Sequence, residues 1–187
     1  MRGLPTIAEL HTRVASAVLG EVLAYWSSFY DRGVLPSFDD VEPWQIKAAL
    51  PYVWIWRRDV DADRFFCRVC GEHVNYIFGR NISGKACDEV MPAKMATEAQ
   101  ARWRHLIDNR IAHHLVGCVY HYADQEVMGE RLILPRAASR NVRGGVLGVT
   151  DASQPTLRLV SPVDPAKFVG IGIGERRDYD AGPARHG

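Results

Sequence analysis

The stretch RFFCRVCGEHVNYIFGRNISGKACDEVMP, residues 64–92, decides how this sequence folds. Its residues 65–70 are rich in aromatic and β-favouring side chains and lie between an Asp-rich turn and a glycine, so they predict a strand. A short helix over residues 73–78 follows. Gly79 closes it, because glycine reaches the left-handed conformation that a helix stop needs. Gly84 permits a second tight bend before the next helical segment.

The order of these elements resembles the PAS sensor domain, whose second strand is followed by a short helix, a glycine and a second pair of glycine and basic residue. The two pairs here are Gly79-Arg80 and Gly84-Lys85. The resemblance covers roughly residues 44–151. It is closest to the short PAS-like proteins of proteobacteria that begin with a long helix. It implies an α+β fold with a five-stranded antiparallel sheet in the order 2-1-5-4-3, helices across one face, and a pocket between the two.

Composition describes an ordinary globular protein. The 187 residues are 47% hydrophobic and 24% charged, and the formal net charge is +1. That charge favours neither nucleic acid nor an anionic membrane as a partner. No apolar run approaches the ~20 residues of a membrane span, and the start MRGLPTIAELH lacks a signal-peptide core, so we expect a cytoplasmic protein. Four cysteines are too few for a disulfide scaffold.

Three segments are expected along the chain. Residues 1–43 form an N-terminal helical extension that can dimerise, and residues 44–153 form the PAS-like domain. Residues 154–187 form a C-terminal extension. Within it, residues 168–173 can add an edge strand, and the final RRDYDAGPARHG is expected to be a disordered tail.

The N-terminal extension predicts one long helix over residues 7–31. Thr6 and Glu9 fit a capping box, and apolar residues then recur every three or four positions. Such a helix would be roughly 37 Å long, more than a small sheet needs for cover. We therefore expect a homodimer, and the alternative is a helix packed wholly on its own domain. The side chains expected in the dimer contact are Val14, Val18, Val22 and Trp26.

The remaining strands follow from apolar runs and turn residues. Residues 52–57, YVWIWR, are apolar on both faces, so we expect the N-terminal helix to cover the outer face of this strand. A long amphipathic helix is expected over residues 93–112. The three strands of a meander are expected at residues 115–122, 127–134 and 145–150.

The pair Cys67-Arg-Val-Cys70 predicts packing thiols and argues against zinc. Residues three apart on a strand point to opposite faces, and a redox pair of this spacing belongs at a helix start. Tetrahedral zinc needs two more converging ligands. The residues that could complete such a site are His73, Cys87 and Cys118.

Flavin and haem are both disfavoured as cofactors. Light-sensing PAS domains place a reactive cysteine directly after Gly-Arg-Asn, but Ile82 stands there and Cys87 is five residues late. A haem ligand is often a histidine on the long helix, yet His105 lies about 200° from Trp103, on the face opposite the apolar stripe.

The other histidines are placed away from a cofactor. His113 and His114 are assigned to the turn between the long helix and the next strand, and His121 to the solvent side of that strand. The sequence therefore identifies no cofactor, and the cofactor is unknown.

We expect a non-catalytic sensory or protein-interaction module that binds a small apolar ligand between sheet and helices. Signalling would pass through dimer contacts or to an unknown signalling protein, because the sequence holds neither kinase motifs nor a basic recognition helix. The residues expected to line the pocket are Phe65, Cys67, Tyr76, Trp103, Ile107, Cys118 and Tyr120.

The alternative is an enzyme. Small cone-shaped α+β enzymes also begin with helices and close a curved sheet over an apolar pocket, where an Asp-His dyad transfers a proton. Asp108 and His121 are candidates that the sequence alone does not pair. A deep pocket that contains an Asp–His hydrogen bond would favour this alternative.

Overall fold

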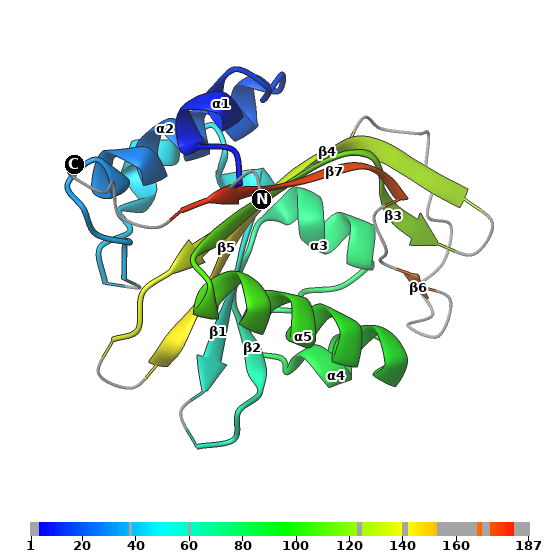
Figure 1. The fold of residues 1–187 in the computed structure, drawn as a ribbon. Helices are drawn as coiled ribbons and strands as arrows, with labels where there is room; N and C mark the ends of the chain where they lie inside the picture. The colour runs from blue at the N-terminus through cyan, green and yellow to red at the C-terminus, as the bar shows by residue number, and fades with distance from the viewer. Residues whose placement is uncertain are drawn as a thin grey trace.

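The computed structural model describes residues 4–37, 39–59, 61–122, 125–139, 142–152, 168–169 and 173–181. Its helices are α1 (Ile7–His11), α2 (Ala17–Tyr30), η1 (Pro43–Ile46), η2 (Leu50–Tyr52), α3 (Glu72–Phe78), α4 (Cys87–Val90) and α5 (Ala93–Asp108). Its strands are β1 (Val53–Asp59), β2 (Phe65–Cys70), β3 (Ile111–Tyr122), β4 (Gln125–Arg136), β5 (Val142–Ala152), β6 (Phe168–Val169) and β7 (Ile173–Asp180). Figure 1 shows one curved sheet with α3, α4 and α5 on one side and α1 and α2 on the other.

The sheet is antiparallel and runs in the order β2-β1-β5-β4-β3, as predicted. The prediction of five strands is wrong, because the chain after β5 returns to the free edge of β3. There β7 pairs with residues 111–118, and β6 pairs with residues 121–122. The fold is therefore α+β with the predicted central order, widened beyond β3.

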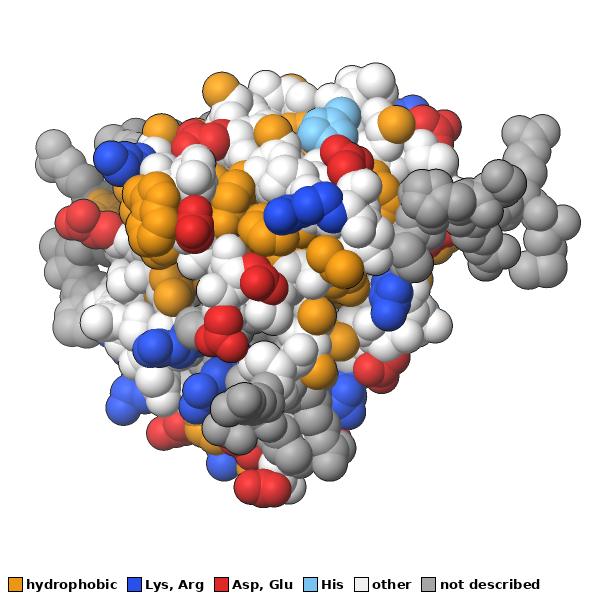
Figure 2. Space-filling model, turned by 90° about the vertical axis from the view of Figure 1, so that its left-hand side faces the viewer, with side chains coloured by type: hydrophobic (Ala, Val, Ile, Leu, Met, Phe, Trp, Pro, Cys, Tyr) orange, Lys and Arg blue, Asp and Glu red, His pale blue; other side chains and the backbone are white. Residues whose placement is uncertain are grey.

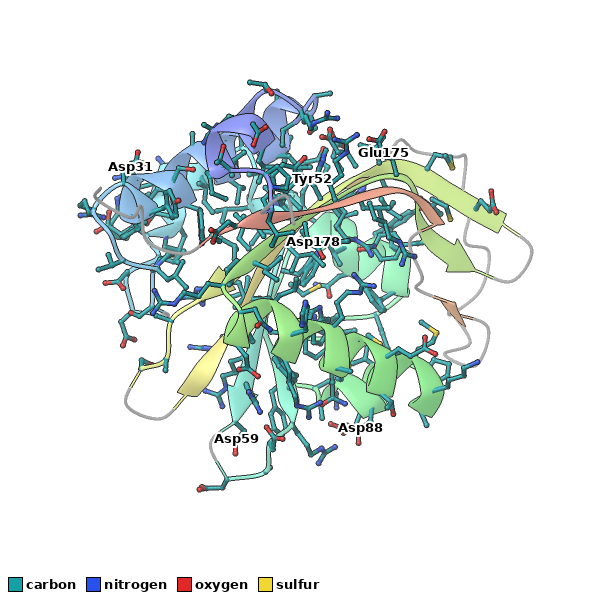
Figure 3. All side chains as sticks on the ribbon, viewed as in Figure 1. Asp31, Tyr52, Asp59, Asp88, Glu175 and Asp178 are labelled. Atoms are coloured by element: carbon teal, nitrogen blue, oxygen red, sulfur yellow. The ribbon has the colours of Figure 1, made fainter. Side chains whose placement is uncertain are left out.

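The predicted disordered tail is wrong for residues 176–180, RRDYD, which end β7. The charged composition of this segment led to the prediction of disorder, but the segment is a strand in which Tyr179 is fully buried on one face. The backbone N–H of Asp180 also donates to the carbonyl of Pro5, 2.9 Å away, which ties this strand to the start of the chain. Figure 3 labels Glu175 and Asp178 on β7. The last six residues lie outside those that the structure describes.

The prediction of one long N-terminal helix is also wrong, because the helix is interrupted between α1 and α2. The capping box of Thr6 and Glu9 starts α1 as predicted. The break is held by Glu130 of β4, whose carboxylate accepts the backbone N–H groups of Ala15 and Ser16 at 3.0 and 2.7 Å. A carboxylate at this point satisfies donors that a continuous helix would have used internally. No helix in the described part of the chain is long and apolar enough to span a membrane.

Both N-terminal helices pack on the face of the sheet that carries Val53 and Ile55, called the outer face below. The predicted cover over this side of β1 is thus confirmed. Val22 and Trp26 are fully buried here against their own sheet, and Val14 and Val18 are partly buried. Val22 and Trp26 therefore pack within their own domain, whereas the predicted dimer contact of Val14 and Val18 stays a prediction. Figure 2 views the molecule from the side where α2 lies in Figure 1, and its exposed hydrophobic side chains are interspersed with acidic and basic ones.

Residues 64–92 form the strand, helix and two turns that were predicted. Gly79 ends α3 with φ +64°, the left-handed conformation expected of it. The following turn closes over the free edge of β2. The N–H of Gly84 donates to the carbonyl of Cys67 at 2.7 Å, and the N–H of Cys67 donates to Lys85 at 2.8 Å.

A bulge in β2 corrects the expectation that its two cysteines diverge. Ile55 pairs with Val69 but Trp56 pairs with Cys67, so one residue of β2 has no partner opposite it. The extra residue reverses the alternation, and both Cys67 and Cys70 face the core under α3. The hydrogen bond that the Cys70 thiol makes to the Cys67 sulfur, together with burial, raises the pKa of Cys70. Among the described residues no three His, Cys, Asp or Glu side chains gather as metal ligands would.

The long helix ends earlier than predicted. α5 stops at Asp108, and Arg110 adopts a positive φ of 52° that turns the chain into β3. His113 and His114 are therefore buried strand residues and not turn residues, and they point to opposite faces of the sheet. The side chain of His121 lies outside those that the structure describes.

Candidate functional site

A cavity of about 690 Å³ lies between the sheet and helices α3 and α5. It opens on the face that carries Trp54 and Trp56, called the inner face below. This volume is within the range of about 300–1,000 Å³ that is usual for small-molecule sites. The apolar side chains around it are Trp54, Trp56, Val74, Phe78, Ile82, Met91, Met95, Ala99, Trp103, Leu115, Tyr120 and Ile133.

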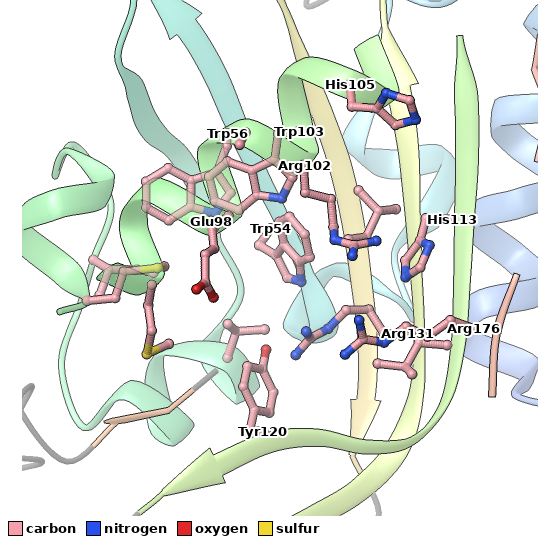
Figure 4. A pocket seen from close by; sticks show the side chains of 18 of the residues that line it. Trp54, Trp56, Glu98, Arg102, Trp103, His105, His113, Tyr120, Arg131 and Arg176 are labelled. Carbon is pink, nitrogen blue, oxygen red and sulfur yellow. The ribbon is translucent and has the colours of Figure 1, made fainter. Parts of the chain in front are cut away.

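Three tryptophans form the apolar centre of the cavity wall. The ring of Trp103 on α5 lies 5.1 Å from that of Trp56 in a stacked arrangement and 6.2 Å from that of Trp54. Phe65 packs edge-on behind Trp103 at 5.3 Å. Figure 4 shows the indoles gathered on one side of the cavity. Such rings offer a flat apolar surface to a ligand.

The position of Trp54 depends on its neighbours in β5. Gly148 lies directly opposite Trp54, and a Cβ there would come within 2.1 Å of the indole. Glycine is thus needed for the ring to lie across β5. The indole N–H then donates to the hydroxyl of Thr150 at 3.0 Å. The same hydroxyl accepts the Nε–H of Arg131 at 3.2 Å, so one buried Thr150 orients two residues of the cavity.

The polar side of the cavity carries three arginines from three elements. Arg102 comes from α5, Arg131 from β4 and Arg176 from β7. Figure 4 shows the guanidinium groups of Arg131 and Arg176 next to each other, with Arg102 reaching toward them from the helix. Glu98 and His105, both exposed, line the cavity from α5.

A histidine and a carboxylate pair at the same side. The Nδ1 atom of His113 lies 2.7 Å from a carboxylate oxygen of Asp178. Burial holds the pKa of His113 below its ordinary value, although the hydrogen bond to Asp178 opposes this shift. The same hydrogen bond is the main cause that lowers the pKa of Asp178. The pair is therefore a neutral imidazole beside a carboxylate at neutral pH.

The structure brings two of the seven predicted pocket residues to the cavity, Trp103 and Tyr120. Phe65 and Cys67 are buried in the core behind the wall, so they support it without lining it. Ile107 is partly buried against the same core.

The other two predicted pocket residues lie elsewhere. Tyr76 is 56% exposed on α3, because Val74 and Phe78 occupy the face of that helix toward the cavity. A bulge between Cys118 and Tyr120 breaks the alternation of β3. The two residues were predicted to share a face, but the bulge leaves Cys118 on the outer face.

Sequence reasoning missed most of the polar residues of the cavity. Trp54 and Trp56 had a visible signal, because they alternate within YVWIW and so share one face. Arg176 and Asp178 had none, since they lie in the segment that was expected to be disordered.

The candidate pair of Asp108 and His121 stays untested, because the side chain of His121 lies outside those that the structure describes. Asp108 is exposed and bonds to Arg58 at 3.3 Å. The Asp–His hydrogen bond of this cavity is instead made by His113 and Asp178.

Comparison with known proteins gives one match. A family model described as PAS domain matches residues 14–150. No curated protein and no solved structure matches the chain. The matched residues begin between α1 and α2 and end within β5, and they include every wall of the cavity except β7.

Proposed function

We propose, from the premise that the chain belongs to the PAS domain family, that it is a sensory or interaction module that binds a small molecule and catalyses no reaction. The observation that carries the proposal is the cavity of about 690 Å³ beside three tryptophans. A cavity of this kind, apolar with a few polar groups on one side, is typical of a ligand site.

The signal is proposed to cross the sheet from its inner to its outer face. His113 and Arg131 line the cavity, while their chain neighbours His114 and Glu130 face the N-terminal helices. His114 and Glu130 bond to each other at 2.7 Å, and Glu130 also holds the junction of α1 and α2. A ligand that shifts β3 or β4 therefore acts on the packing of these helices as well.

The receiver of the signal is proposed to be a second copy of this chain or another signalling protein. Val22 and Trp26 are buried in their own domain, so Val14 and Val18 are the remaining members of the predicted contact. Equilibrium sedimentation of the variant with Val14→Lys and Val18→Lys tests this contact. A wild-type dimer that the variant loses supports it, and a wild-type monomer at micromolar concentration contradicts it.

Native mass spectrometry of freshly purified protein tests the proposed function. We expect an added mass on the wild-type chain and its loss in Trp103→Ala, because Trp103 borders the cavity and contacts both other tryptophans. The matched control is Trp44→Ala, since Trp44 is 60% exposed and lies outside the cavity wall. An added mass that survives in Trp103→Ala, or is lost in both variants, contradicts the proposed site.

The alternative function, proton transfer in an enzyme, has one observation in its favour. The hydrogen bond between His113 and Asp178 orients an imidazole of lowered pKa at the cavity wall, as a general base requires. The copurifying molecule separates the two functions. Released and mixed again with a trace of wild-type protein, it stays unchanged if the chain only binds it. Turnover that stops in His113→Asn would establish the enzyme instead.

A further inference from the structure

The three arginines of the cavity are close enough to repel one another. Desolvation lowers the pKa of Arg176 first, and the charges of Arg102 and Arg131 lower it further, although Arg102 and Arg176 are both exposed. Like charges that converge repel one another, and the exposure of Arg102 and Arg176 to water weakens this repulsion without removing it.

Only one of these arginines is satisfied by its own chain. Arg131 donates to Thr150 at 3.2 Å and to the carbonyl of Val119, and its guanidinium lies 4.4 Å from the ring of Tyr120. By contrast, Arg102 and Arg176 have no hydrogen-bond or ion-pair partner within the part of the chain that is described. Their N–H donors are available at the cavity.

The acidic side chains of the cavity do not balance these charges. Asp178 is engaged with His113 at 2.7 Å, and Glu98 is the other carboxylate in the wall. His113 adds no negative charge. Three guanidinium groups thus face two carboxylates, one of which already has a partner.

We propose that the cavity takes a small organic anion with a flat apolar body. This inference rests on the proposed function, and it names the chemical class of the ligand. A carboxylate, sulfonate or phosphate group would accept hydrogen bonds from Arg102 and Arg176, because guanidinium groups match the geometry of such oxyanions. Arg131 would lie beside them and add its positive charge. The apolar body would lie along the tryptophans.

The ligand would also connect three elements of the fold. Its charged group would link α5 with β4 and β7, the three elements that carry the arginines. The arginine of β7 lies beyond the residues that match the PAS family model. The C-terminal extension of this chain therefore completes the anion site.

Two fluorescent probes with one ring system test the charge requirement. 8-Anilinonaphthalene-1-sulfonate carries a sulfonate, and N-phenyl-1-naphthylamine is the same skeleton without it. We expect wild-type protein to bind the sulfonate at least tenfold more tightly, because charge-assisted hydrogen bonds favour the anion. Equal or weaker binding of the sulfonate would overturn the inference.

Single arginine variants test which residues hold the charge. Arg176→Leu should weaken sulfonate binding about tenfold and leave binding of the neutral probe unchanged. The matched control is Arg177→Leu, which removes the same charge from the same strand but on its outer face, where Arg177 bonds to Glu175 at 2.9 Å. Arg102→Leu repeats the test from α5 if Arg176→Leu fails to fold, as judged by near-ultraviolet circular dichroism.

The outcomes separate this inference from the proposed function. If both probes bind equally and Trp103→Ala abolishes both, the ligand cavity stands and its anion preference is refuted. If neither probe binds folded wild-type protein, both the cavity's role and the anion inference fail. A loss of sulfonate binding in Arg177→Leu equal to that in Arg176→Leu would show only a general charge effect, and would also refute the inference.

Discussion

Charged side chains on the two faces of the sheet differ in whether they have hydrogen-bond partners among the described residues. On the outer face, Glu130 is buried and accepts hydrogen bonds from Ala15, Ser16 and His114. On the inner face, Arg176 lines a cavity and, among the described residues, has no such partner. A buried charge with all its bonds made serves the fold, whereas an unsatisfied charge at a cavity is available to a ligand.

The same contrast holds for the aromatic side chains. Trp26 fills the outer core, and its N–H donates to the carbonyl of Pro135 at 3.0 Å. Trp54 and Trp103 are nearly as buried, but each also borders the cavity. We therefore expect the outer face to contribute most of the stability and the inner face to carry the proposed binding.

The largest expected effect is on the outer face. Trp26→Ala should lower the free energy of unfolding by about 3–5 kcal/mol, because it leaves a large hole in a packed core. Urea unfolding measures the change. The exposed Trp44→Ala should cost less than about 0.5 kcal/mol. Equal losses of unfolding free energy in the two variants would contradict the conclusion that the outer core stabilises the fold.

Glu130→Ala should cost about 3 kcal/mol, because it leaves the donors of Ala15, Ser16 and His114 without their acceptor. Hydrogen exchange of the backbone amides at positions 15 and 16 should also become faster. Glu126→Ala, at an exposed position of the same strand, is the control. A cost as small as that of the control would mean that Glu130 does not hold the break between α1 and α2.

Gly148→Ala should cost about 1–3 kcal/mol, because the new Cβ meets the Trp54 indole at 2.1 Å. The near-ultraviolet circular dichroism of the indoles should change with it. Gly20→Ala provides the opposite control, since nothing lies within 4 Å of a Cβ there. Alanine at this position within α2 should stabilise by roughly 0.5–1 kcal/mol.

Acid should destabilise the inner face through His113. Burial holds the pKa of His113 below its ordinary value, so the folded state binds fewer protons there than the unfolded state. The contribution of His113 to the free energy of unfolding is fully present above about pH 6.5. It decreases as the pH falls below that value. Urea unfolding at pH 7 and pH 5 should therefore show a smaller loss in His113→Asn than in wild type. An identical loss would remove His113 as the cause.

The smallest expected effect is that of Arg176→Leu on stability, within about 0.5 kcal/mol of wild type. The residue is exposed, and no bond within the described chain is lost with it. Differential scanning calorimetry checks this. A loss comparable to that of Glu130→Ala would show that the inner-face charge belongs to the fold.

The sequence predicted the central fold because the main signals were local. The apolar run of β1, the alternating apolar residues of β2 and the glycine that ends α3 require no knowledge of distant contacts. The strand order came from the family resemblance.

The errors have a shared physical cause, which is contact between segments far apart in the chain. The break before α2 depends on Glu130, more than a hundred residues away. The strand at 173–180 depends on the free edge of β3. Each bulge shifts a whole strand by one residue, so Cys70 and Cys118 exchanged faces with respect to the prediction. The polar half of the cavity was missed for the same reason.

Hydrogen–deuterium exchange with and without 8-anilinonaphthalene-1-sulfonate tests the central claim most directly. If the inner face binds the probe, amide exchange should become slower in α5, β4 and β7. If this binding alters the packing of the N-terminal helices on the outer face, exchange should also change at residues 12–16 between α1 and α2. Arg176→Leu, treated at a probe concentration near the wild-type dissociation constant, should show both changes strongly reduced, because it binds the probe about tenfold more weakly. Protection confined to the cavity, with residues 12–16 unaffected, would contradict a signal that crosses the sheet.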